Sequence, residues 1–299
     1  MRVFLTGATG FIGSRIVPDL IQAGHQVVGL TRSDEGASRL TAAGAEVHRG
    51  TLEDPDSVRS GAEKADGVIH CAFDHDFSNF AANCDKDRRV IEAIGSVFKG
   101  SDRPFVITSG TGLGSAGPGK PADEDLLDLT HANPRVASEM AGNVLLETGV
   151  NVIIMRLPQV HDTIKQGLIT PLLAIIRERG VSAYVGDGSN RYPAAHVADV
   201  ARLYRLALEK GQKGARYNAV AEEGIPLKHI VEVLGKGLGL PVKSITPDEA
   251  KDYFGWMAMF AGMDLWASGA KTQARLDWHP NGPGLIEDLE KMNYSTAGQ

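Results

Sequence analysis

The sequence predicts an α/β fold of the Rossmann type, a doubly wound parallel sheet with a smaller, mostly helical C-terminal lobe. Short β-branched apolar runs alternate with helix-like segments through the first half of the chain. A glycine-rich turn follows the first run directly, and after about residue 157 the alternation loosens while Gly and Pro become frequent. Repeated strand and helix at this spacing indicates parallel strands joined by right-handed crossovers.

The strands expected in the first half are continuous apolar runs, because helices cover both faces of a parallel sheet. They are Arg2 to Thr6, Gln26 to Thr31, Ala45 to His48, Gly67 to Cys71, Pro104 to Thr108 and Val152 to Arg156. Segments with apolar residues at helical spacing lie between them, near 11 to 23, 34 to 43, 55 to 64, 80 to 95 and 134 to 148. Asp54 before Pro55 is a good helix N-cap.

The second half predicts more helix than strand. Helices are expected near 167 to 180, 196 to 210, 226 to 239 and 284 to 292, and strands at Ser182 to Val185 and Arg216 to Val220. We therefore divide the chain into a nucleotide-binding domain over 1–160, to which 190–220 partly returns, and a substrate lobe over 161–299. Ligands of open α/β folds bind at the carboxyl ends of the strands, where such a lobe would close.

The composition and net charge of the chain exclude several classes of binding partner. The chain has 299 residues, of which 42% are hydrophobic and 23% charged, and a formal net charge of −6. This charge argues against nucleic acid or an anionic membrane as the main partner. No apolar stretch approaches the ~18 residues of a spanning helix, and the start MRVFLTGATG has no signal-peptide pattern, so we expect a cytoplasmic protein. Cys71 and Cys84 lack metal-ligand spacing, and no metal site is expected.

The run from Thr6 to Gly13, TGATGFIG, lies between the first expected strand and a helix. A diphosphate binds bare backbone N–H groups at a helix N-terminus, where side chains would block its approach. Gly7 would give the tight turn, Gly10 would admit the phosphates, and Gly13 would let the helix press on the strand. The expected dinucleotide contacts are Gly7, Thr9, Gly10, Phe11, Ile12 and Gly13.

The GxxGxxG spacing, with segments along nearly the whole chain, resembles the short-chain dehydrogenase/reductase superfamily, in particular its extended and atypical branches of the NAD-dependent epimerase/dehydratase type. The segments are TGATGFIGS, GLTRS, RGTLEDPDS, DGVIHCA, FVITSG, MRLPQV, VGDGSNRYPAAHVADVARL and KTQARLDWHP. The resemblance implies a nicotinamide dinucleotide as cofactor.

The end of the second strand predicts which nicotinamide cofactor binds. Sites that prefer NAD place an acidic residue there, whereas this chain has Arg32 and Ser33, which suit a 2′-phosphate. NADP(H) is therefore preferred, and NAD(H) remains possible. The resemblance implies further cofactor contacts beside the adenine, along the path to the nicotinamide and at its carboxamide, namely Leu52, Ala72, Phe73, Ser109, Arg135, Leu157 and Pro158.

The resemblance also implies a catalytic Tyr-x-x-x-Lys pair, but none of the six tyrosines has Lys four residues later. If Glu139 matches the Glu that often follows the family's Lys by four residues, Arg135 takes the Lys position and His131 the Tyr position. A frame shifted by four would put Arg135 at Tyr and Glu139 at Lys. A histidine titrates near neutrality and can deliver a proton. The ordinary alternative role of His131 is that of a loop residue that caps the helix before Asn133.

A hydroxyl that binds the substrate oxygen is implied just after the fifth strand, where the chain reads Thr108-Ser109-Gly110-Thr111. Gly110 takes the position of the residue that would carry this hydroxyl, so Ser109 or Thr111 must supply it instead. The ordinary alternative role of Ser109 is to cap the turn. From the lobe, Tyr192 and His196 are candidate proton donors, and His161 is a weaker one.

These features predict an NADPH-dependent reductase of a small aldehyde or ketone. Two alternatives stay open: a nucleotide-sugar epimerase or dehydratase that uses Arg177, Arg179 and Arg191 on a diphosphate, and a non-catalytic NADP(H) sensor.

Two apolar surfaces complete the prediction. An aromatic and methionine-rich segment is either core or an apolar wall over the nicotinamide; it comprises Phe254, Trp256, Met257, Met259, Phe260 and Trp266. A homodimer is possible through a helix face with Ala137, Met140, Ala141 and Val144.

Overall fold

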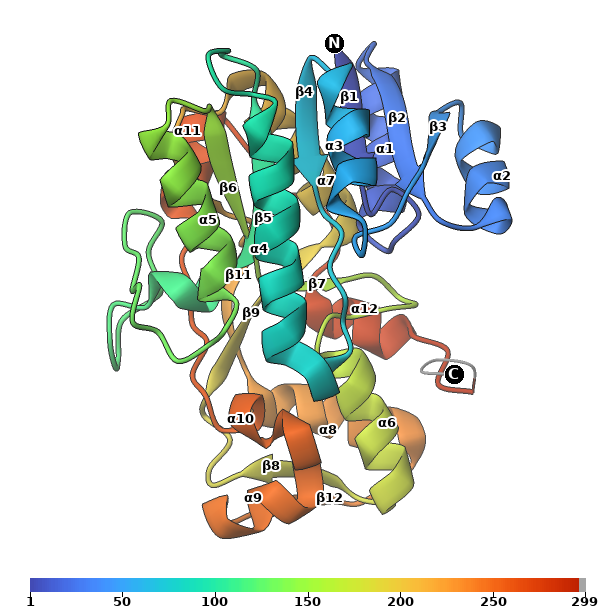
Figure 1. The fold of residues 1–299 in the computed structure, drawn as a ribbon. Coiled ribbons are helices and arrows are strands. Elements are labelled where there is room, and N and C mark those ends of the chain that lie inside the picture. Colours follow the sequence, from blue (N-terminus) through green and yellow to red (C-terminus); the bar gives the residue numbers. More distant parts are fainter. Residues whose placement is uncertain (296–299) are drawn as a thin grey trace.

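A seven-stranded parallel sheet forms the centre of the larger part of the protein, which a computed structural model describes over residues 1–295 (Figure 1). Its order is β10-β6-β5-β4-β1-β2-β3. The strands are β1 (Arg2–Thr6), β2 (Gln26–Thr31), β3 (Glu46–Arg49), β4 (Gly67–His70), β5 (Phe105–Gly110), β6 (Val152–Leu157) and β10 (Arg216–Asn218). The order reverses between β1 and β4, and ligands of doubly wound sheets bind at this switch point. The predicted fold class is confirmed.

Helices cover both faces of this sheet, because alternate strand residues point to opposite sides. Val3 and Leu5 of β1 belong to a core shared with α1 and α7, whereas Phe4 belongs to a core shared with α3, α4 and α5. The helices of this part are α1 (Gly13–Gln22), α2 (Asp34–Ala42), α3 (Pro55–Glu63), α4 (Phe80–Ser96), α5 (Val136–Glu147) and α7 (Val197–Lys210). The Asp54 side chain caps α3 as expected, by accepting from the amides of Asp56 and Ser57.

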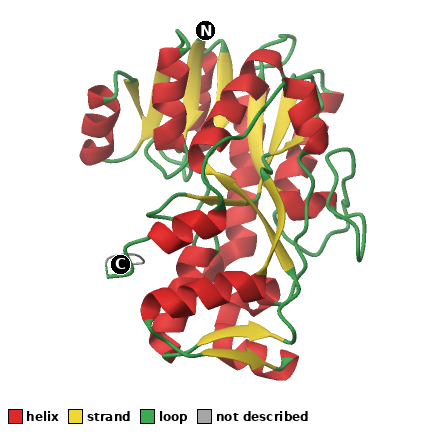
Figure 2. Cartoon of the chain, turned by 180° about the vertical axis from the view of Figure 1, so that it is seen from behind, coloured by secondary structure: helices red, strands yellow, loops and turns green. Residues whose placement is uncertain are grey.

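The lobe contains more strands than the sequence predicts (Figure 2). A mixed sheet has the order β11-β9-β7, and a parallel pair joins β12 to β8. The strands are β7 (Gln159–His161), β8 (Ser182–Val185), β9 (Arg191–His196), β11 (Glu222–Pro226) and β12 (Val242–Ile245). The helices of the lobe are α6 (Ile169–Arg179), α8 (Leu227–Leu238), α9 (Pro247–Phe254), α10 (Ala258–Ala261) and α12 (Leu285–Lys291), with the 3-10 turn η3 (Gly255–Met257). Outside the lobe lie α11 (Ala270–Leu276) and the 3-10 turns η1 (Phe77–Asn79) and η2 (Thr111–Gly114).

The C-terminal segment does not stay in the lobe throughout. Trp278 is fully buried in the core formed with α1 and α7, and its indole Nε1 donates to the carbonyl of Asp199 at 3.1 Å. Residues 270–278 therefore return to the large sheet, which the predicted division at residue 161 did not include.

The structure also describes the membrane-spanning potential of the helices, the clusters of metal-binding side chains and the two thiols. Among residues 1–295, no helix combines the length and apolar content needed to cross a bilayer. The same residues contain no cluster of three or more His, Cys, Asp or Glu side chains suited to a metal ion. Cys71 and Cys84 are free thiols, and burial raises the pKa of each to about 11. On α5, Met140 and Val144 are exposed, but Ala141 is buried and cannot contact a second copy of the chain. The homodimer through this helix face stays a prediction, without Ala141.

Candidate active site

The turn after β1 brings three segments of backbone into close contact. Gly7 has a φ of +70°, and a Cβ added to it would lie 2.8 Å from the amide nitrogen of Ala72. A Cβ on Gly13 would lie 2.0 Å from the carbonyl oxygen of Gly7. The Gly10 amide donates to that same carbonyl at 2.9 Å. Glycine at positions 7 and 13 is therefore required for the packing of the turn itself.

The turn leaves donors free at the start of α1. Within residues 1–295, the amides of Phe11 and Ile12 donate to no acceptor. The N-terminus of α1 has no side-chain cap and no acidic residue in its first turn. Unpaired N–H groups at a positive helix end bind anions, so the residues present fit the diphosphate of a dinucleotide.

Arg32 differs from the other arginines near the end of β2. Arg49 pairs with Asp34, and Arg39 lies 3.8 Å from Glu35. The exposed Arg32 has neither an ion pair nor a hydrogen bond to any residue that the structure describes. The Ser33 hydroxyl accepts from the Gly36 amide at 3.0 Å, which caps α2 and leaves its own hydrogen available.

From the turn, the backbone after β4 leads toward α5. The Ala72 amide donates to the Thr6 hydroxyl at 3.2 Å, and the ring of Phe73 lies 3.9 Å below Cζ of Arg135. Leu52 is half-buried against the sheet core. Leu157 pairs with Gly110 in the sheet, directly before Pro158. The predicted contacts thus lie along the carboxyl ends of β1, β4, β5 and β6.

The guanidinium of Arg135 is held at the carboxyl end of β5. Its Nη2 donates to the carbonyl of Thr108 at 2.8 Å. Nη1 lies 2.9 Å from Oδ2 of Asp87, but the direction is not that of a hydrogen bond, and within residues 1–295 the buried Nη1 has no hydrogen-bond partner. The carboxylate of Asp87 therefore balances the charge of Arg135, while the N–H groups of Nη1 remain available to donate hydrogen bonds.

Asp87 connects Arg135 to the turn after β1. Its Oδ1 lies 3.0 Å from Nε2 of His70, whose Nδ1 lies 2.7 Å from the Thr6 hydroxyl. Ser138 donates to Oδ2 at 2.7 Å. Burial alone would raise the pKa of Asp87, but the charge of Arg135 and the His70 hydrogen bond outweigh it and hold this pKa below its ordinary value. The sequence prediction did not include this chain of side chains: His70 stands in the apolar run GVIHCA, but Asp87 lies among charged residues that give no sign of its burial.

Glu139, on α5 one turn after Arg135, is the second buried carboxylate of this region besides Asp87. It accepts from Nε and Nη2 of Arg156 at 2.8 and 2.9 Å, from Nε of Arg216 at 2.9 Å and from the Ser109 hydroxyl at 2.8 Å. Burial would raise the pKa of Glu139, but Arg156, Arg216 and Ser109 together lower it. Glu139 is therefore fully occupied by Arg156, Arg216 and Ser109, whereas Arg135 keeps an Nη1 group without a hydrogen-bond partner among residues 1–295. The frame with His131 at the Tyr position and Arg135 at the Lys position stays a prediction.

The two candidate hydroxyls after β5 have different surroundings. Ser109 is buried and donates inward to Glu139. Thr111, at the start of η2, has no hydrogen bond from its hydroxyl to the described residues. A Cβ on Gly110 would meet no atom within 4 Å, so open space lies beside this strand end. Thr111 is therefore the better placed hydroxyl for a substrate oxygen.

The predicted proton donors His131 and Tyr192 differ in their hydrogen bonds and in their burial. Nδ1 of His131 accepts from the Asn133 amide at 3.0 Å, which assigns the proton of a neutral ring to Nε2. Tyr192 is buried in the lobe core and donates to the carbonyl of Phe260 at 3.0 Å, and burial raises its pKa. A phenol that is enclosed and already bonded is a poor proton donor, so Tyr192 is not carried into the proposal below.

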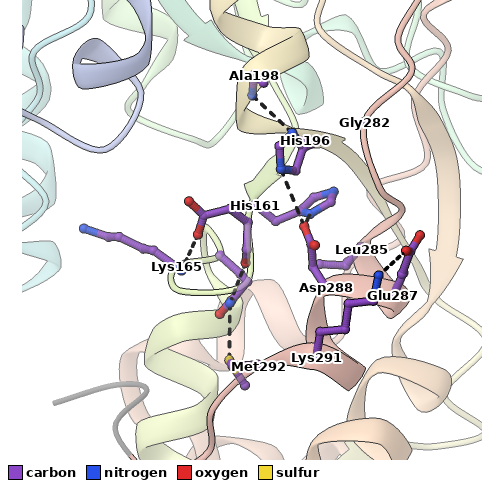
Figure 3. A network of polar contacts seen from close by, with 12 residues as sticks. His161, Lys165, His196, Ala198, Gly282, Leu285, Glu287, Asp288, Lys291 and Met292 are labelled. Atoms are coloured by element: carbon purple, nitrogen blue, oxygen red, sulfur yellow. Dashed lines mark hydrogen bonds and ion pairs between the residues drawn. The ribbon is translucent and has the colours of Figure 1, made fainter.

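His161 and His196 lie where α12 docks on the mixed sheet (Figure 3). Nδ1 of the fully buried His161 is 2.7 Å from Oδ2 of Asp288, and Nε2 of His196 is 4.0 Å from the same oxygen. Burial lowers the pKa of His161 in spite of the Asp288 charge. The Ala198 amide donates to His196 at 3.3 Å. These contacts give both histidines a structural role at this junction.

Comparison with known proteins agrees with this geometry. Residues 3–220 match the NAD dependent epimerase/dehydratase family. The chain belongs to this family. It is 45% identical over 295 residues to an uncharacterized protein of Schizosaccharomyces pombe, a match that covers 98% of this chain and 100% of that protein.

More distant members of the family carry assigned names. Vestitone reductase of Medicago sativa is 27% identical over 85% of this chain and 86% of that enzyme. The structure of dTDP-glucose 4,6-dehydratase from Streptomyces venezuelae with NAD bound has a TM-score of 0.75 at 18% identity, over 97% of this chain and 96% of that one. The likeness to the dehydratase shows a shared fold.

The turn of this family member can be tested at Gly13. Gly13→Ala places a Cβ against the carbonyl of Gly7, so the turn must shift and its free amides lose their alignment. We expect NADPH affinity to fall at least about tenfold, as for the loss of one or two charge-assisted hydrogen bonds, in a fluorescence titration. Gly262→Ala is the control, because its Cβ meets no atom within 4 Å. Equal affinities in Gly13→Ala and the wild type would contradict the assignment.

The buried carboxylate of α5 makes a stability prediction. Glu139→Ala leaves Arg156 buried without its partner and should lower the free energy of unfolding by about 3–5 kcal/mol, measured in urea. Because the pKa of Glu139 is lowered on folding, its contribution is complete above the ordinary carboxyl pKa and disappears as the pH falls below it. The difference between variant and wild type should therefore shrink in acid. Glu287→Ala, which removes an exposed ion pair with Lys291, should change stability little at any pH.

Proposed function

We propose that this protein is an NADPH-dependent reductase of aldehydes or ketones. The observation that carries the proposal is the pair of unused donors at the carboxyl end of β5, the Nη1 group of Arg135 and the hydroxyl of Thr111. Both lie where the sheet order of this fold places a ligand. The name of vestitone reductase, a relative over most of the chain, supports the same class of reaction.

The residues of the turn would hold the cofactor. The amides of Phe11 and Ile12 would bind the diphosphate, and Arg32 with Ser33 would bind the 2′-phosphate. NADPH, when bound, supplies a hydride for the substrate carbon. The Nη1 group of Arg135, which lies beside Asp87 without a hydrogen bond to it, would bind ribose hydroxyls, since a guanidinium donates in several directions at once.

The chain's own residues would supply the charge stabilisation and the proton. As the carbonyl oxygen gains negative charge, the Thr111 hydroxyl donates to it. Arg135 adds positive charge but does not release a proton at physiological pH. His131, as an imidazolium with a proton on each ring nitrogen, would deliver its Nε2 proton to the oxygen, which leaves a neutral ring, and would later recover a proton from solvent. Formation of the imidazolium requires the Asn133 amide to leave Nδ1.

The nucleotide-sugar alternative loses its proposed phosphate contacts. Arg191 pairs with Asp264 and stacks on Trp266, and Arg179 donates to the carbonyl of Asp252. Arg177 donates to the carbonyl of Tyr294. With all three engaged inside the lobe, a reductase is the better supported proposal.

Replacement of Arg32 tests the cofactor. Arg32→Ala removes the one unpaired guanidinium near the 2′-phosphate, so NADPH affinity should fall about 10- to 100-fold, as for a charge-assisted hydrogen bond. NADH affinity should stay within about twofold of wild type, because NADH lacks that phosphate. Calorimetric titration of both dinucleotides measures this, with Arg88→Ala on the surface of α4 as control. Equal losses for NADPH and NADH would contradict the assignment of Arg32.

Turnover of carbonyl compounds tests the reaction. Thr111→Val should lower kcat at least about tenfold by loss of one donor to the oxyanion, with NADPH affinity unchanged. Adding Gly110→Ser should restore part of kcat, because the space beside Gly110 is open and its backbone is extended. Consumption of NADPH with a panel of aldehydes and ketones is the measurement, and Val144→Ala on α5 is the control. Tight NADPH binding without turnover of any carbonyl by wild type would favour the sensor alternative instead.

A further inference from the structure

The segment between β4 and α4, residues 72–80, forms a strap that joins the cofactor path to the lobe. It starts at Ala72 beside the Gly7 turn, and its Phe73 ring lies under Arg135. The strap then runs down to the lower end of α4, toward the lobe (Figure 1). Any substrate that approaches Arg135 from the lobe side must therefore pass this strap.

The strap meets the lobe through aromatic rings. Phe77 stacks on Trp256 with ring centroids 4.5 Å apart and planes 8° from parallel. Phe80 lies 5.3 Å from Phe77, and Phe260 lies 6.3 Å from Phe77 and 6.4 Å from Trp256. Phe73 is 6.1 Å from Phe80. These five rings, the aromatic cluster, form a continuous path from Arg135 to the lobe.

The cluster is not a closed core. Trp256 is 42% exposed in spite of its stack, and Met259 and Met263 in the same segment are 49% and 39% exposed. Exposed aromatic and thioether groups that gather at one place commonly bind apolar ligands. Phe254 and Met257, which the sequence grouped with Trp256, are instead buried in the lobe core.

The cation of Arg135 lies at the Phe73 end of the cluster, whereas the strap beside Phe77 is acidic and disfavours an anionic group on the part of the substrate that binds there. The strap itself carries Asp74 and Asp76, and hydrogen bonds from Ser78 and Asn79 hold the pKa of Asp76 below its ordinary value. Asp74 shares Lys86 with Glu53. Arg191, which could have faced a phosphate, is paired with Asp264.

We propose that Phe77, Trp256 and Phe260 bind the non-reacting part of the substrate, and that this part is an uncharged aromatic or apolar group. The substrate ring would take the place of one partner in the Phe77–Trp256 stack, with its carbonyl directed toward Thr111 and Arg135. This inference rests on the proposed function for the carbonyl, but the aromatic contact can be measured without turnover.

The experiment uses benzyl alcohol, an uncharged aromatic alcohol, as probe in calorimetric titrations of the full-length protein saturated with NADPH, because an alcohol and the reduced cofactor cannot react with each other. We expect Trp256→Ala to weaken binding about tenfold through lost stacking and buried area. Trp256→Phe, which keeps a ring, should restore most of the affinity and guards against a folding defect in the alanine variant. Val144→Ala, exposed on α5, should bind as wild type does.

Three results would overturn the inference: no binding of benzyl alcohol to wild type, equal binding by wild type and Trp256→Ala, or tighter binding of UDP-glucose than of benzyl alcohol. Failure of the proposed function gives a different result, since NADPH would then not be consumed with any carbonyl. If NADPH does not bind, the titrations are made without it and the same comparison of variants decides.

Discussion

The buried carboxylate of Glu139 fixes the position of α5, and the candidate site depends on that position. Two arginines from neighbouring strands, Arg156 and Arg216, meet this one side chain in a place without solvent. A buried ion pair adds little net stability but is costly to break. Its effect is therefore to define one arrangement of α5 on the sheet. Arg135, one turn earlier, is placed at the end of β5 as a result.

Asp87 extends this arrangement to the turn after β1. The contacts from Arg135 through Asp87 and His70 to Thr6 cross the sheet beneath the path of the expected dinucleotide. Since Thr6, His70 and Asp87 are buried and Arg135 is nearly so, a displacement at one end leaves a polar group unpaired at the other. The turn after β1 and Arg135 are thereby coupled through the buried side chains of His70 and Asp87.

The sequence predicted the large sheet and the longer helices of the second half, but it missed strands β7, β9, β11 and β12 of the lobe, for a physical reason. Parallel strands buried on both faces produce continuous apolar runs, whereas β9 contains Pro193 and pairs with β7 and β11, which are distant in sequence. The glycine turn was predictable because it needs particular residues at fixed spacing. The choice between Ser109 and Thr111 was not, since it depends on which hydroxyl Glu139 binds.

The change from a Tyr and Lys pair to His131 and Arg135 has a chemical consequence for the proposed reaction. In the family's pair the Lys lowers the pKa of the Tyr, so charge and proton donor work as one unit. A guanidinium does not lose its proton in this range, and Asp87 already neutralises much of its charge. In the proposed reaction the proton would then come from a separate group, for which we propose the imidazole of His131. Separation of the two tasks explains why Arg135 can be locked in buried contacts while His131 lies in the half-exposed loop before α5.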